Sequence, residues 1–154
     1  MYGTFQVGYL HVCIPTGVIQ LVNIPLIFAG SLAILGAAIH GAAGEALVVR
    51  KLSPGTLPST RFGGSGMTRA MIHVTWHMTT IGLLTVGCAL LLAGSVLHGD
   101  EARGIALLGA AGSTGFAAVA LWLGGSAQPL QSVIRHPGPA VLTATAALAW
   151  WGAL

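Results

Sequence analysis

Three histidines and one glutamate lie at the facing ends of two apolar segments of this chain. His40 and Glu45 come near the end of the first segment, and His73 and His77 come near the start of the second. Imidazole nitrogens and carboxylate oxygens bind zinc, iron and copper, and ionisable groups at membrane depth usually have a function. We therefore predict a metal or cofactor site in which the three histidines are ligands and Glu45 is a ligand or orients one.

The spacing of these residues determines which of them can share a ligand. His73 and His77 are four residues apart, so on a helix they lie on one face with their Cβ atoms about 6 Å apart. His40 and Glu45 are five residues apart, which turns them about 140° from each other. These two converge only if the helix unwinds between them; otherwise they serve different neighbours.

Other interpretations of the same residues stay open. His40 and one histidine of the second segment could bind haem b inside a four-helix bundle and support electron transfer. Glutamate and histidine at a membrane surface could instead relay protons or line an ion path. A purely structural interpretation has the histidines anchoring helix ends at the interface, with Glu45 paired to Arg50 or Arg69.

The composition indicates that membrane-spanning helices position these groups. Of the 154 residues, 55% are hydrophobic and 6% are charged, and the mean hydropathy is +0.85. Soluble domains carry about 25% charged residues. The apolar runs are long and do not alternate, so they indicate helices rather than strands. We predict an all-α integral membrane four-helix bundle that forms one transmembrane domain over residues 1–154.

Four spans are predicted, at about residues 17–42, 69–97, 104–124 and 140–154. Asn23 and Pro25 fall inside the first span, where a proline predicts a kink. Residues 46–68 form a basic, turn-rich loop, and Thr68 is placed to cap the second span. The leader, residues 1–16, is rich in aromatic residues and is expected to lie near a membrane surface.

The cations predict how the chain is oriented. Arg103 lies on one side of the predicted membrane, and five other cations lie in or beside the two loops on the opposite side: Arg50, Lys51, Arg61, Arg69 and Arg135. The positive-inside rule then places both termini outside the cytoplasm, with the protein in a bacterial inner membrane. The net charge of +3 is spread over several spans, so no nucleic-acid partner is expected.

Small residues predict close packing of the first span. Ala29, Ala33, Ala37 and Gly41 recur every four residues and let another helix approach closely. This pattern also fits an alternative function, that of a non-catalytic accessory subunit on a larger respiratory or photosynthetic membrane complex, or self-association within the lipid bilayer. The sequence has no nucleophile, phosphate-loop or nucleotide motif, and whether the protein is an enzyme stays open.

One pattern in the first two spans resembles a known group of proteins. Its residues are His40, Gly44, Glu45, Arg50 and Leu52, followed by Arg69, Trp76 and His77. This HxxxGE stretch with a later R…WH stretch resembles a group of small bacterial multi-span membrane proteins. No activity is known for that group, so the resemblance implies no function.

Overall fold

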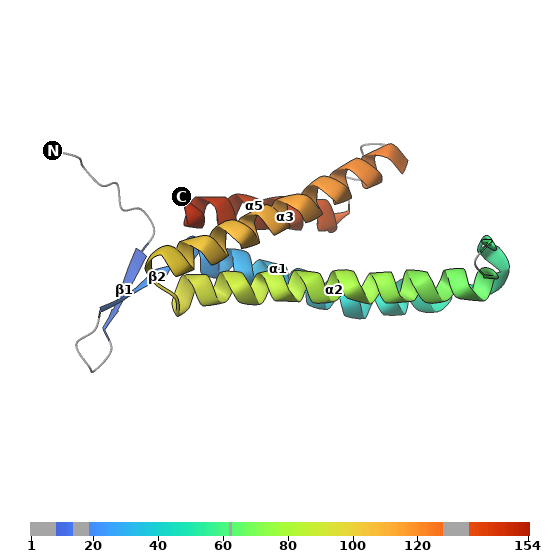
Figure 1. The fold of residues 1–154 in the computed structure, drawn as a ribbon, viewed down its shortest axis with the longest axis horizontal. Coiled ribbons are helices and arrows are strands. Elements are labelled where there is room, and N and C mark those ends of the chain that lie inside the picture. The colour runs from blue at the N-terminus through green and yellow to red at the C-terminus, as the bar shows by residue number, and fades with distance from the viewer. Residues whose placement is uncertain (1–8, 14–18, 62, 128–135) are drawn as a thin grey trace.

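The computed structural model describes residues 9–13, 19–61, 63–127 and 136–154, and in these ranges most of the chain is helical (Figure 1). The long helices are α1 (Ile24–Leu47), α2 (Ser65–Ser95), α3 (Gly99–Ala127) and α5 (Pro137–Ala153). Two short 3-10 turns, η1 (Val49–Lys51) and η2 (Pro54–Thr56), lie between α1 and α2. The predicted all-α helical bundle is confirmed.

Among the described residues, three segments are long and apolar enough to cross a membrane: Ile24–Lys51, Ser65–Ser95 and Gly99–Leu123. The 17 residues of α5 extend about 25 Å, slightly less than the hydrocarbon core of a bilayer. Large apolar side chains cover the outside of the bundle; Met71 and Ile81, for example, are each 62% exposed. These features are those of a membrane protein whose outer surface faces lipid.

A hairpin that the sequence patterns did not predict precedes the first helix. Strands β1 (Tyr9–Cys13) and β2 (Ile19–Asn23) pair in antiparallel register, so the expected helix start near residue 17 is wrong. The expected kink at Pro25 is also wrong, because Pro25 lies in the first turn of α1, where its missing N–H breaks no helical hydrogen bond. Asn23 caps this turn, and its Oδ1 accepts a hydrogen bond from Leu26 N at 3.2 Å.

The second helix, in contrast, begins earlier than expected. Its first residue is Ser65 and its N-cap is Gly64, so the prediction that Thr68 caps this helix is wrong. The Thr68 hydroxyl instead donates to the carbonyl of Pro58 at 2.8 Å and ties the loop to the helix. Arg135 and most of the leader, residues 1–8 and 14–16, lie outside the described residues.

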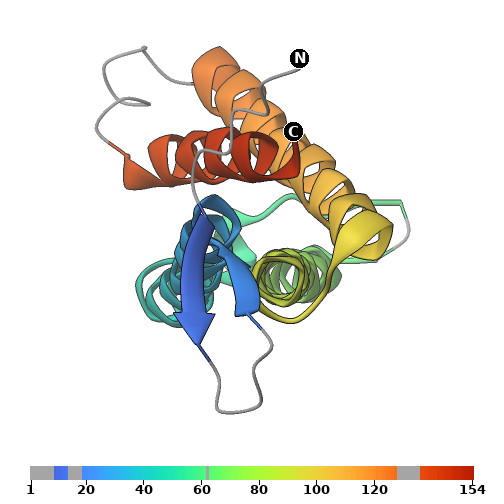
Figure 2. The ribbon, with the colours of Figure 1, turned by 90° about the vertical axis from the view of Figure 1, so that its left-hand side faces the viewer.

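The helices form two antiparallel pairs that lie against each other. In Figure 2, α1 lies beside α2, and the α3–α5 pair lies across them. The core between the pairs is made of small side chains and two leucines: Leu26, Ala29, Leu90, Ala93, Ala106, Ala110, Ala149 and Ala153. The predicted small-residue stripe is confirmed, since Ala29, Ala33 and Ala37 are 0%, 4% and 0% exposed.

Two glycines bring the backbones of α1 and α2 together in the middle of the bundle. A Cβ atom built on Gly30 would lie 2.7 Å from the carbonyl oxygen of Gly87, closer than real Cβ contacts allow. Toward the α1–α2 loop, α3 leans away from this pair, and the end of the α1–α2 hairpin extends beyond α5 (Figure 1). The functional candidates lie at this end.

Candidate metal centre

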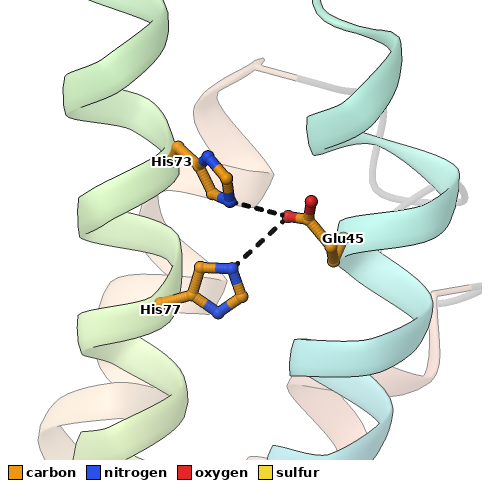
Figure 3. Close-up of side chains that lie close together, drawn as sticks. All are labelled: Glu45, His73 and His77. Carbon is orange, nitrogen blue, oxygen red and sulfur yellow. Dashed lines mark ion pairs between the residues drawn. The ribbon is translucent and has the colours of Figure 1, made fainter.

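Three of the predicted site residues meet across the α1–α2 interface. Glu45 lies in the last turn of α1 and points at two histidines of α2 (Figure 3). Its Oε2 atom is 3.1 Å from Nε2 of His73 and 3.4 Å from Nε2 of His77. One ligand atom from each of the three residues lies within 4.8 Å of the others. The structure thus brings together a carboxylate and two imidazoles from separate helices.

The regular turn of α2 positions the two imidazoles. His73 and His77 are stacked one turn apart, with ring centroids 5.0 Å apart and ring planes tilted by 47°. Each presents Nε2 to the same carboxylate oxygen of Glu45 (Figure 3). The expectation that the two histidines share one helix face is confirmed.

The distances match those between ligands of one small ion. Zinc binds histidine nitrogen and carboxylate oxygen at about 2.0–2.2 Å, so two donors at tetrahedral angles lie about 3.4 Å apart. The two oxygen-to-nitrogen distances that Glu45 makes, 3.1 and 3.4 Å, are close to this separation. A modest rearrangement of side chains would therefore suffice for all three groups to bind one ion.

The carboxylate of Glu45 has two oxygens in different environments. Oε1 accepts a hydrogen bond from Nε of Arg50 at 3.3 Å, which is one of the two pairings that the purely structural interpretation offered. Oε2 is buried and has no hydrogen-bond partner within the described ranges, because its contacts with the histidines lack hydrogen-bond geometry. A buried carboxylate oxygen is costly without a partner. A cation between Oε2 and the imidazoles would remove that cost.

His40 lies outside this group of three residues. Its ring stacks on Trp76, with a centroid distance of 4.3 Å and an interplanar angle of 8°. Its Nε2 is buried and makes no hydrogen bond to any part of the chain that the structure describes. Because α1 is continuous through this region, His40 and Glu45 serve different neighbours, which was one of the two alternatives drawn from their spacing. Ligation by His40 stays a prediction.

Trp76 is a positioning residue that the sequence interpretation missed. Its ring lies between α1 and α2, and its Nε1 donates to the carbonyl of His40 at 3.0 Å. The ring fills the space over Gly44, where an added Cβ would lie 2.2 Å from the ring atom Cζ2. The absence of a side chain at Gly44, directly before Glu45, was the signal that a large group approaches α1 here.

The surroundings of the site are basic. Arg50, Lys51, Arg61 and Arg69 are all exposed at this end of the bundle, whereas residues 46–99 contain no aspartate or glutamate. The negative charge of Glu45 is therefore the only carboxylate charge of the α1–α2 hairpin. An ion bound here would lie beside fixed positive charge.

The site as a whole offers two nitrogen donors and one oxygen donor at the end of an apolar bundle. Such a set suits borderline transition metals, whereas calcium and magnesium prefer oxygen donors alone. All three donors come from α1 and α2. No protein-family model, curated protein or solved structure matches this chain, so its function is inferred from the geometry of this site.

Proposed function

We propose that this protein is a membrane protein that binds a transition metal ion through Glu45, His73 and His77. The observation that carries the proposal is the convergence of three donor atoms, one of which is the buried Oε2 of Glu45 that has no hydrogen-bond partner among the described residues. The basic residues beside the site support the proposal that it faces the cytoplasm at an inner membrane, as the positive-inside rule predicts. Both termini would then lie on the other side.

The donor set favours zinc, iron or copper. Iron or copper would permit one-electron transfer at this site, whereas zinc has no redox chemistry in proteins. Haem b has less support than a bare ion, because His73 and His77 are on one helix face and point the same way. His40, the partner expected from the other helix, is stacked on Trp76.

The interior of the α1–α2 interface does not favour an ion path. Directly below the site, Gly41 faces the side chain of Thr80, whose hydroxyl donates to the backbone carbonyl of Trp76. Further along, Leu83 is buried, and Gly30 brings the backbone of α1 close to that of α2. A bound ion would therefore be held at the surface of the bundle rather than conducted between these helices.

The alternative function, an accessory subunit, draws less support from the structure. The small residues that suggested a surface for a partner protein are used inside this chain. Ala33 and Ala37 are buried, and an added Cβ on Gly109 would meet Leu90 at 2.7 Å. The exposed faces carry large apolar side chains, which suit lipid.

Elemental analysis and a visible spectrum of the protein purified in mild detergent test the proposal first. We expect a stoichiometric transition metal and no haem Soret band. Metal-stripped protein is then titrated with Zn²⁺. Glu45→Gln, His73→Ala and His77→Ala should each weaken binding by more than about 100-fold, since even groups that only support a ligand account for about 10- to 100-fold.

His98→Ala is the matched control, because His98 is an exposed histidine at the opposite end of α2. It should bind Zn²⁺ like the wild type. Wild-type affinity in all three ligand variants would refute the proposed site. A Soret band that is present in the wild type and lost in His40→Ala would indicate a haem site instead.

A further inference from the structure

We infer that the metal ion in this centre keeps an open coordination position that accepts a small anionic ligand from water. This inference rests on the proposed function. It extends that function from holding an ion to presenting the ion to an exogenous ligand.

The first argument is the number of donors. Within the described residues, Glu45, His73 and His77 supply three ligand atoms, and zinc or cobalt takes at least four. A further imidazole at this interface, that of His40, is held flat against Trp76, which itself is fixed by a hydrogen bond to the backbone of α1. His40 therefore cannot turn toward the ion while this stack persists, and the fourth position is left to a ligand from outside.

The second argument is the direction in which the site is open. The Glu45 side chain is 17% exposed, whereas those of His73 and His77 are 50% and 44% exposed. The carboxylate thus closes the site toward α1, and the histidine side stays accessible. Glu45 is close to the end of α1 at Leu47, and the next turn carries the exposed Arg50. An exposed guanidinium is stable only near water, so we infer that the aqueous phase meets the site at this end of the hairpin.

The third argument is charge. The Arg50 guanidinium is bonded to the carboxylate that would hold the ion, and its side chain is 74% exposed. Lys51 follows it directly, and no carboxylate occurs between Glu45 and Asp100 in the sequence. Positive charge beside an open metal position favours anions over neutral ligands. Binding is a simple exchange in which a metal-bound water leaves and the anion takes its place.

Cobalt(II) and azide provide the test on the full-length protein. Metal-stripped protein is loaded with one equivalent of Co²⁺, and its visible ligand-field bands are recorded while azide is added. We expect a saturable change that fits one azide per cobalt. Arg50→Gln should weaken azide binding about two- to five-fold, the range expected for one exposed charge pair. Lys51→Gln, which removes the same charge without a contact to Glu45, should have a smaller effect.

Two outcomes overturn the inference, and they are distinguishable. If Co²⁺ binds stoichiometrically but azide leaves the spectrum unchanged up to high concentration, the coordination sphere is closed and only this inference fails. If Co²⁺ does not bind, or binds equally well to His77→Ala, the proposed metal centre fails and the inference fails with it.

Discussion

Gly44→Ala is the substitution that most directly tests how the site is held. The added methyl group would lie 2.2 Å from Cζ2, 2.7 Å from Cε2 and 2.8 Å from Nε1 of Trp76. Favourable contacts between carbon atoms are about 3.5–4.0 Å, so the ring or the helix must move by more than 1 Å. That movement breaks the hydrogen bond from Trp76 to His40 O and separates Glu45 from the histidines of α2.

The expected free-energy change is a balance of opposing effects. Overpacking an interface costs about 1–3 kcal/mol, and the lost hydrogen bond about 1 kcal/mol. Alanine is favoured over glycine in a helix interior by about 1 kcal/mol, which offsets part of this loss. We therefore expect a net destabilisation of about 1–3 kcal/mol. At about 2–4 °C per kcal/mol for a chain of this size, the Tm should fall by several degrees.

Thermal unfolding in detergent, followed by circular dichroism, measures this change, and Zn²⁺ titration reports on the site. Gly115→Ala is the matched control, since no atom lies within 4 Å of a Cβ at that helical position, and it should leave the Tm unchanged or raise it. Trp76→Leu in the Gly44→Ala background should recover part of the lost stability. If Gly44→Ala and Gly115→Ala unfold at the same temperature, Trp76 does not pack closely against Gly44 and the reasoning is refuted.

The remaining predictions concern the same helices. Asn23→Ala should cost about 2 kcal/mol, because it removes the cap of α1 and the bond from Nδ2 to Gly152 O at 2.7 Å, about 1 kcal/mol each. Asn23→Asp keeps the cap and should recover about half of the lost Tm. Gly87→Ala should lower the Tm more than Gly104→Ala, because its Cβ would meet Ile34 at 2.7 Å whereas position 104 is open; equal shifts would contradict this packing. Trp76→Phe, which can keep the stack but loses the indole N–H, should weaken Zn²⁺ binding less than His77→Ala does in the same titration.

The fold was predictable because the apolar runs are long. In lipid the backbone N–H and C=O groups need hydrogen-bond partners within the protein, and a helix is the simplest structure that provides them. The helix ends were less predictable, since hydropathy does not distinguish an apolar strand from an apolar helical turn. Residues 19–23 illustrate this limit, because they continue the apolar run of α1 but pair as a strand. Asn23 and Pro25 led to the prediction of a kink inside the helix. A capping residue two positions before a proline is, however, also typical of a helix start.

The sequence predicted which site residues share a face of one helix, but it predicted less well which residues of the two helices meet. The four-residue spacing of His73 and His77 was sufficient to place both rings on one face. Which residue of α1 meets them depends on the register of the two helices, to which the fit of Trp76 against Gly44 and the approach of Gly30 to Gly87 both contribute. No periodicity in a single helix contains this information. His40 was grouped with the ligands because it lies near the end of the first apolar segment, from where it could face a histidine of the second, but its ring stacks on Trp76.

All three donors of the centre belong to the first two long helices, which has a consequence for how the protein is made. Chains are synthesised from the N-terminus at about 5–20 residues per second, so the residues from Val96 to Leu154 take about 3–12 s. During this interval the α1–α2 hairpin can form while α3 and α5 are still emerging, and under the proposed function it would already be able to bind an ion. Metal capture would then precede closure of the bundle, and the ion would act as an early clamp on a hairpin that its later helices cover only in part.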